Sequence, residues 1–146
     1  MKLLITGATG GIGTRIIEIA KTNYKINFLT TKKSNLKSIK SAKGFFWDPK
    51  NNFIDEECFD GVDTIIHLSG EKISNRWTKK TKLKLYDSRI LSTKLLYNSV
   101  LKLKSIHKIK SFICASAIGI YKSEFQKKYN EKSKIIPSNF LENLVF

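Results

Sequence analysis

The chain has 146 residues, of which 41% are hydrophobic and 11% aromatic, a composition typical of one folded domain over residues 1–146 and not of a disordered chain. No run of about 18 apolar residues occurs, which argues against a membrane span. The formal net charge is +15, but only Arg15, Arg76 and Arg89 are arginines, and the lysines are scattered along the chain. Proteins that read nucleic-acid sequences favour arginines and clustered basic stripes. We therefore expect non-specific attraction to nucleic acid and no specific nucleic-acid partner.

A glycine-rich segment close to the start of the chain is the most informative feature. The apolar run Lys2–Ile5 predicts a buried strand, and the apolar residues between Ile12 and Ala20 have helical spacing. The glycines between them fall on a strand-to-helix turn, where a pyrophosphate can approach bare backbone at the positive end of a helix. A turn without a ligand is the alternative. The candidate cofactor-binding residues of this segment are Thr6, Gly7, Thr9, Gly10, Gly11, Ile12 and Gly13.

Further strands and helices alternate along the rest of the chain. Strands are predicted, in order, over Lys25–Thr30, Gly44–Trp47, Val62–Leu68 and Ser111–Ala115. Residues 50–61 are polar and predict turns. A long helix is predicted from about Lys79 to Lys104, with an apolar stripe formed by Leu83, Tyr86, Ile90, Leu91, Leu95, Tyr97, Val100 and Leu101. A last helix is predicted from Pro137 to Phe146, capped by Ser138.

This alternation indicates an α/β fold, a Rossmann-type doubly wound parallel sheet. Right-handed crossovers give the strand order 3-2-1-4-5 and a ligand crevice at the carboxyl ends of strands one and four. Leu68, Ser69 and Gly70 would there meet the glycine turn. We therefore add these three residues to the predicted cofactor site.

The end of the second strand bears on which dinucleotide binds. NAD readers place Asp or Glu there to accept the ribose 2′-hydroxyl, whereas this chain has Thr30, Thr31, Lys32 and Lys33. Hydroxyl and ammonium groups suit a 2′-phosphate. The pattern favours NADP over NAD, with Thr31 and Lys32 as the binding residues.

The two cysteines carry no signal for a metal or a disulfide framework. Cys58 and Cys114 match no metal-ligand spacing, and Cys114 lies in an apolar run. The N-terminus enters a strand without a signal-peptide pattern. We expect reduced, buried thiols in a cytoplasmic protein without a metal site.

Several interrupted motifs in the middle of the chain resemble one group of short-chain dehydrogenase/reductases. Residues 67–73 read H-L-S-G-E-K-I, followed by R-W-T at 76–78, D-S-R-I at 87–90, S-T at 92–93 and A-S-A-I-G-I-Y at 115–121. The pattern is similar to that of the atypical, sugar-nucleotide-epimerase-like proteins called epimerase family, within the NAD-dependent epimerase/dehydratase family. The resemblance runs over essentially the whole chain.

The resemblance implies a bound NADP(H) and a role for Ser116, which also adjoins the cofactor. In the wider superfamily a serine at this position donates a hydrogen bond to the reacting oxygen, and a Tyr four residues before a Lys is the acid/base. Here that spacing falls on Phe140 and Leu144, which cannot move a proton. Tyr121 is the candidate substitute, with a purely structural tyrosine as the alternative.

Other residues of the motifs have structural interpretations beside functional ones. Arg76 and Trp77 either clamp a substrate or anchor the loop before the long helix. We expect His67 to be a satisfied structural histidine, and Asp87 and Arg89 to tie helix to loop by hydrogen bonds. Members of this group are about twice as long, which suggests that a C-terminal part is missing.

Two functions follow from the sequence. The first is an NADP(H)-binding epimerase/reductase-like protein, incomplete in length, that transfers a hydride at a sugar-nucleotide or another hydroxyl or carbonyl carbon. The second is a non-catalytic dinucleotide- or partner-binding remnant. A second polypeptide could complete the fold, and the unfinished C-terminal edge could associate with other molecules.

Overall fold

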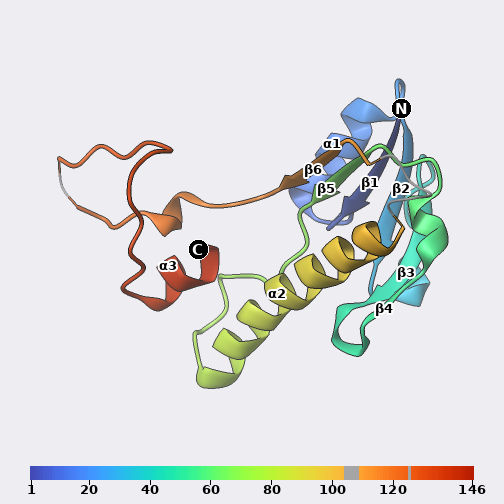
Figure 1. Ribbon diagram of the computed structural model, residues 1–146. Coiled ribbons are helices and arrows are strands. Elements are labelled where there is room, and N and C mark those ends of the chain that lie inside the picture. The colour runs from blue at the N-terminus through green and yellow to red at the C-terminus, as the bar shows by residue number, and fades with distance from the viewer. Residues whose placement is uncertain (104–108, 125) are drawn as a thin grey trace. The chain divides into compact units, whose positions relative to one another are not determined.

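The computed structural model describes residues 1–103, 109–124 and 126–146. Its chain forms two compact units, Met1–Cys114 and Ala115–Phe146. Figure 1 shows the sheet and the two longer helices within the first unit. The prediction of one domain over residues 1–146 stays a prediction. Within the described part of the chain, no helix is long and apolar enough to cross a membrane.

The first unit is built on a six-stranded sheet in the order β4-β3-β2-β1-β5-β6. The strands are β1 (Lys2–Thr6), β2 (Lys25–Thr30), β3 (Lys43–Asp48), β4 (Phe53–Ile54), β5 (Thr64–His67) and β6 (Ser111–Cys114). All neighbours pair in parallel except β3 and β4. The predicted five-stranded parallel order 3-2-1-4-5 is confirmed, with an antiparallel edge strand added beyond the third strand.

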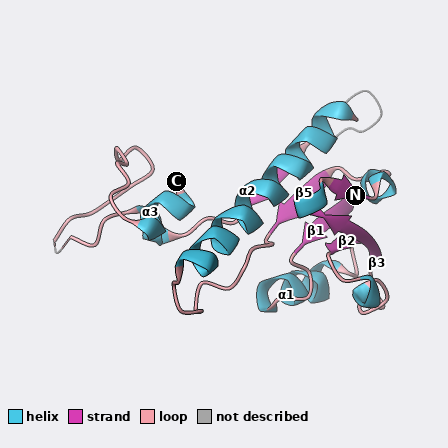
Figure 2. Cartoon of the chain, turned by 90° about the horizontal axis from the view of Figure 1, so that it is seen from below, coloured by secondary structure: helices cyan, strands magenta, loops and turns pink. Residues whose placement is uncertain are grey.

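Two helices cover opposite faces of the sheet (Figure 2). Helix α1 (Gly11–Ala20) packs Ile17 and Ala20 against one cluster of strand side chains, and α2 (Lys79–Lys102) packs Leu95 and Leu96 against another. Neighbouring residues of β1 belong to different clusters because successive side chains of a strand point to opposite faces. The result is the covered α/β sheet that the sequence predicts.

The apolar stripe predicted for α2 is wrong in its detail. Leu83, Tyr86, Tyr97 and Leu101 are exposed, and Lys104 lies outside the described residues. The buried face consists of Leu85, Ser92, Leu95, Leu96 and Ser99. The two serines can be buried because each donates its hydroxyl to a carbonyl one turn back, at 2.6 Å to Ser88 O and 2.8 Å to Leu95 O. A pattern that counts only apolar residues misses such a face.

Residues 50–61, expected to be polar turns, contain β4 and two short 3₁₀ helices, Pro49–Asn51 and Glu56–Phe59. Cys58 and Phe59 are fully buried on the α2 side of the sheet. Asn27, inside β2, donates to the carbonyl of Cys58 at 2.7 Å and holds this segment against the sheet. Burial raises the pKa of the Cys58 thiol. The other cysteine, Cys114, is exposed at the end of the edge strand β6, contrary to the expectation of burial.

The second unit contains a 3₁₀ turn, Ile118–Ile120, and a short helix, α3 (Phe140–Val145). The helix begins later than predicted and its cap is Asn139, not Ser138. Asn139 Oδ1 accepts from the N–H of Glu142 at 3.0 Å, and the Glu142 carboxylate reaches back to Ser138. This reciprocal arrangement is a capping box displaced by one residue.

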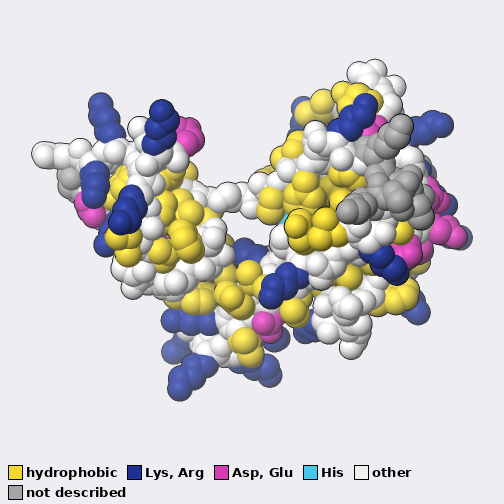
Figure 3. All heavy atoms as spheres, viewed as in Figure 1, with side chains coloured by type: hydrophobic (Ala, Val, Ile, Leu, Met, Phe, Trp, Pro, Cys, Tyr) yellow, Lys and Arg dark blue, Asp and Glu magenta, His cyan; other side chains and the backbone are white. Residues whose placement is uncertain are grey.

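On the face drawn in Figure 3, lysine and arginine side chains are spread over both units.

Candidate functional site

The glycine turn after β1 has a backbone that only glycine permits at two of its positions. Gly7 has φ +67°, in the left-handed region that favours glycine. A Cβ on Gly13 would lie 2.3 Å from the Gly7 carbonyl oxygen, so the first turn of α1 touches the turn before it. Gly10 closes the loop by donating its N–H to the same oxygen at 3.0 Å. These contacts fix the strand-to-helix turn.

The N-terminus of α1 faces open space. Gly10 is the N-cap residue, and no side chain caps the helix within the described part of the chain. A Cβ on Gly11 would meet no described atom within 4 Å, and Thr9 and Ile12 are exposed. First-turn N–H groups without a capping side chain attract anions, and the helix dipole adds to this attraction. The residues fit a phosphate group.

The segment after β5 forms the second wall of the site. A Cβ on Gly7 would lie 2.9 Å from the backbone of Leu68 and 3.0 Å from Ser69 N, so the two loops touch. The Ser69 hydroxyl oxygen is buried and has no hydrogen-bond partner among the described residues. An orphaned polar atom is costly to bury unless a ligand satisfies it. It therefore points to a polar ligand beside the glycine turn.

Thr6, His67 and two hydroxyls of α2 form a buried network beneath this wall. Thr6 Oγ1 lies 2.7 Å from His67 Nδ1 and accepts from the N–H groups of Leu68 and Ser69, both at 3.1 Å. His67 Nε2 lies 3.2 Å from Thr93 Oγ1. His67 is thus hydrogen-bonded on both sides, as expected of a structural histidine. The predicted ligand Thr6 is fully buried and its hydroxyl is committed within the protein.

Arg89 ties the loop after β5 to α2, as the sequence predicts. Its guanidinium donates to the carbonyl of Leu85 at 3.0 Å and to that of Glu71 at 3.4 Å, and packs 3.3 Å from a Cβ built on Gly70. Ser88 Oγ accepts from the Glu71 N–H at 3.0 Å. Burial lowers the pKa of Arg89, and the carboxylate of Glu71 opposes that effect. The exposed Gly70 is held in place by these contacts.

The end of β2 presents Thr31 and Lys32 to solvent. The Thr30 hydroxyl accepts from the Lys32 N–H at 3.2 Å and stays within the turn. Lys33 differs from Lys32, since its Nζ lies 5.3 Å over the ring of Phe46. A cation over an aromatic face is attracted to that face. Lys32 is therefore the better placed of the two ammonium groups for a ligand phosphate.

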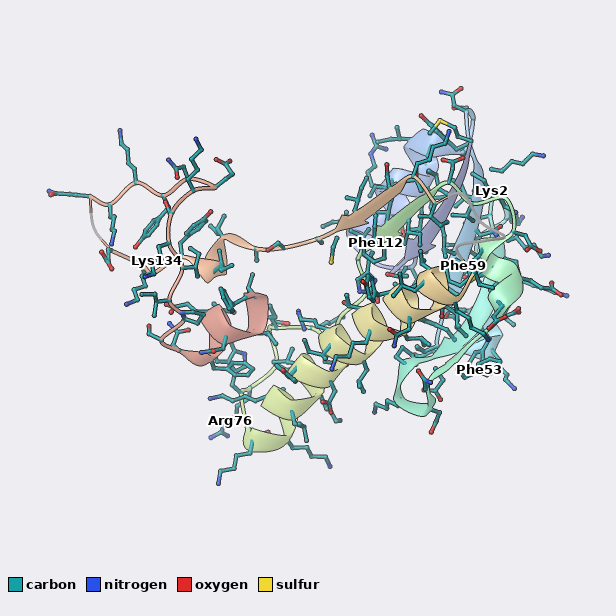
Figure 4. All side chains as sticks on the ribbon, viewed as in Figure 1. Lys2, Phe53, Phe59, Arg76, Phe112 and Lys134 are labelled. Atoms are coloured by element: carbon teal, nitrogen blue, oxygen red, sulfur yellow. The ribbon has the colours of Figure 1, made fainter. Side chains whose placement is uncertain are left out.

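Arg76 and Trp77 lie in the loop before α2, where Figure 4 shows Arg76 at the amino-terminal end of the helix. The Trp77 indole donates to the carbonyl of Ile73 at 2.9 Å. Thr78 caps α2, accepting from the Thr81 N–H at 3.2 Å, and donates its own N–H to the Arg76 carbonyl. These bonds support the anchoring role of this loop, and the exposed Arg76 side chain remains the candidate substrate contact.

Ser116 and Tyr121 belong to the second unit. Ser116 is exposed two residues after the carboxyl end of β6. The Tyr121 hydroxyl donates to the carbonyl of Asn130 at 3.4 Å, and its ring stacks on Tyr129 with centroids 4.9 Å apart. These contacts favour the structural alternative for Tyr121, and its role as an acid/base stays a prediction. Phe140 opens α3 and Leu144 is buried near its end. Both have hydrocarbon side chains, so neither supplies an acid or a base.

The sequence reasoning assigned no role to Ser92 and Thr93 beyond the family motif. Both lie on α2 and contact His67 Nε2, at 3.3 Å and 3.2 Å. A signal was present, because Ser88 and Ser92 stand one turn apart on the same side of the helix. Such a line of hydroxyls marks a face that packs against polar groups.

Comparison with known proteins decides the family. The sequence model of the NAD dependent epimerase/dehydratase family matches residues 3–140. The chain belongs to this family. Its members in Staphylococcus include an epimerase family protein of Staphylococcus saprophyticus, 32% identical over 98% of this chain and 46% of that protein. An epimerase family protein of Staphylococcus aureus is 33% identical with the same coverage. The chain spans about half the length of these relatives.

Solved structures show the same fold. UDP-glucuronic acid 4-epimerase from Bacillus cereus in complex with NAD superposes with a TM-score of 0.72 at 21% identity, over 99% of this chain and 48% of that chain. ElxO with NADP bound gives a TM-score of 0.68 at 18% identity, over 84% of this chain and 58% of that chain. The Rossmann-like epimerase/dehydratase fold of the family is therefore shown.

Proposed function

We propose that this chain binds a nicotinamide dinucleotide at the glycine turn, with NADP(H) preferred to NAD(H). The observation that carries the proposal is the pairing of the uncapped α1 N-terminus with the buried, unpartnered Ser69 hydroxyl in the adjoining loop. One feature suits a phosphate and the other a polar group of the same ligand. Membership in the family supports this assignment.

Three parts of the dinucleotide have matching groups in the first unit. The backbone N–H groups between Gly10 and Gly13 hold the pyrophosphate, because the open space over Gly11 lets it approach. Ser69 and Gly70 lie beside the adenosine or ribose portion. Thr31 and Lys32, exposed at the end of β2, take the 2′-phosphate, which is why NADP is preferred.

The proposed chemistry is hydride transfer at a sugar-nucleotide or another hydroxyl or carbonyl carbon. The dinucleotide, when bound, accepts or supplies the hydride. Ser116 is the proposed hydrogen-bond donor to the reacting oxygen, Tyr121 the candidate proton carrier, and Arg76 with Trp77 the candidate substrate contacts. This activity is that of the family fold as a whole, of which the chain spans about half.

A non-catalytic dinucleotide- or partner-binding protein is the second candidate. The Tyr121 hydroxyl is hydrogen-bonded within its own unit, and Phe140 and Leu144 stand where a proton-transfer pair is expected. These observations favour binding without turnover. Turnover measurements on the chain separate the two candidates, whereas binding measurements test what they share.

Titration calorimetry with NADPH tests the shared proposal. Gly10→Asp should abolish binding, because it places a carboxylate against the pyrophosphate. Its Cβ would make a tight contact of 3.3 Å with the Gly7 carbonyl oxygen, so circular dichroism must verify that the variant folds. Asn98→Asp, an equal change of charge at an exposed position of α2, is the matched control and should bind like the unmodified protein. A folded sample that gives no heat with either dinucleotide would overturn the proposal.

A further inference from the structure

The Thr6 hydroxyl lies within hydrogen-bond distance of three groups, and the chemistry of these groups fixes where its hydrogen points. A hydroxyl has one hydrogen and two lone pairs. Both lone pairs of Thr6 Oγ1 are used by the N–H groups of Leu68 and Ser69, which can only donate. The hydrogen therefore points to His67 Nδ1, 2.7 Å away. The Nδ1 atom accepts and carries no proton.

The same count assigns the other side of the ring. Ser92 donates its hydrogen to a backbone carbonyl, Ser88 O at 2.6 Å, so towards His67 its oxygen can only accept. A neutral imidazole without a proton on Nδ1 carries it on Nε2. That N–H donates to α2, to Thr93 Oγ1 at 3.2 Å or Ser92 Oγ at 3.3 Å. Hydrogen bonds therefore run from Thr6, at the end of β1, through the His67 ring to α2, with the Thr6 hydroxyl and the Nε2–H group as the donors.

The surroundings of His67 favour this neutral form. The side chain is 3% exposed, and the rings of Trp47 and Phe112 lie with their centroids 6.4 Å and 6.2 Å from its own. Cys114, its register partner on β6, is a titratable neighbour; although the residue is exposed, partial desolvation raises the pKa of its thiol. The described contacts from β1, β3, β6 and α2 include no charged side chain.

We infer that His67 is a positioning residue of the dinucleotide site. Its unprotonated Nδ1 holds the Thr6 hydroxyl so that both lone pairs face the Leu68 and Ser69 N–H groups. These groups in turn set the position of the orphaned Ser69 hydroxyl and of the backbone against which Gly7 packs. The inference rests on the proposed function and identifies how the second wall of its site is kept in shape.

Two substitutions at the same position separate the two ends of the ring. In His67→Asn the amide oxygen can take the place of Nδ1, so Thr6 keeps its acceptor while the link to α2 is lost. In His67→Gln the longer amide reaches the place of Nε2, so the link to α2 is kept while Thr6 loses its acceptor. Thr6→Val removes the hydroxyl itself and leaves two N–H groups unpaired.

Affinity for NADP⁺ by calorimetry, with far-ultraviolet circular dichroism to verify folding, is the first measurement. His67→Asn should bind within about threefold of the unmodified protein, and both His67→Gln and Thr6→Val about tenfold more weakly, as for the loss of about one net hydrogen bond. A tenfold loss in folded His67→Asn, or unchanged binding in the other two, would overturn the inference.

Nuclear magnetic resonance supplies a second measurement that needs no cofactor. At pH 7 the imidazole ¹⁵N shifts of His67 should show a protonated Nε2 and a bare Nδ1, and amide exchange at Leu68 and Ser69 should be about tenfold faster in His67→Gln than in His67→Asn. A protonated Nδ1, or equal exchange in the two variants, would refute the positioning role. If these results hold but the unmodified protein does not bind NADP⁺, the proposed function fails and the positioning of the loop stands.

Discussion

Acid should destabilise this protein through His67, and replacing His67 by asparagine should remove that effect. Burial lowers the pKa of the imidazole from its ordinary value of 6.5 to about 4. The unfolded chain therefore takes up a proton before the folded chain does as the pH falls. The contribution to the free energy of unfolding is constant above pH 6.5, and stability falls with pH from there to about pH 4.

The size of the effect follows from the two pKa values. The full difference between 6.5 and about 4 corresponds to about 3 kcal/mol, of which about 2 kcal/mol is lost by pH 5. This is a large share of the stability of a small domain. The amide that replaces the imidazole in His67→Asn does not titrate, so the free energy of unfolding of that variant lacks this component.

Urea denaturation followed by tryptophan fluorescence at pH 7.5, 6, 5 and 4.5 measures this difference. The unmodified protein should lose about 2 kcal/mol more than His67→Asn between pH 7.5 and 5. His107 and the carboxylates are present in both proteins and cancel in the comparison. Equal pH dependence of the two proteins would show that the ring is not buried in its neutral form, and the hydrogen-bond assignment would fail with it.

Three further predictions concern the glycine turn, the cofactor and turnover. Gly13→Ala should destabilise the fold by about 1–3 kcal/mol or more, because its Cβ would lie 2.3 Å from the Gly7 oxygen. Gly11→Ala, whose Cβ meets nothing within 4 Å, should stabilise α1 by about 0.5–1 kcal/mol. Chemical denaturation measures both changes, and equal effects would contradict the packing. Lys32→Ala should weaken NADPH binding about tenfold and leave NADH binding unchanged. Lys33→Ala should have a smaller effect and is the control, because the native Lys33 ammonium lies over the ring of Phe46. Equal affinity of the unmodified protein for both cofactors, measured by calorimetry, would refute the preference. The 146-residue chain should not oxidise NADPH with a panel of carbonyl compounds, followed by absorbance of the cofactor, and sustained turnover that Ser116→Ala abolishes would make it an enzyme on its own.

The parallel sheet and the glycine turn could be predicted because their signals are local. Glycines 7, 10 and 13 follow one apolar run and precede a helical one, and the structure gives each a contact or an angle that explains it. The order of the five parallel strands followed from the alternation of strands and helices in a doubly wound sheet, together with right-handed crossovers. These features depend on backbone geometry that few residue types permit.

Features that depend on long-range contacts could not be predicted in the same way. The buried face of α2 includes Ser92 and Ser99, whose polarity is compensated by bonds to their own helix. Phe59 is buried although its neighbours in sequence are acidic, since the segment packs against the sheet through Asn27. Hydrophobic patterning gives no information about such compensation.

In the candidate site too, features with local sequence signals could be predicted and features set by long-range contacts could not. The sequence identified Ser69 and Gly70 from their place after a strand, and the structure adds that the Ser69 hydroxyl lacks a partner among the described residues. A structural role for His67 was predictable, but its partner Thr6 lies 61 residues away and could be found only from the pairing of β1 with β5. Specific hydrogen bonds of this kind arise from register, which composition does not encode.

The central claim, a dinucleotide held at the glycine turn, is tested most directly by an NADPH titration followed through the backbone amide resonances of the ¹⁵N-labelled chain. Saturable shifts concentrated at the N–H groups of Gly10–Gly13 and at Ser69 are predicted, because these surround the uncapped helix end and the orphaned hydroxyl. An unchanged spectrum, or shifts confined to lysines away from this turn, would contradict the account.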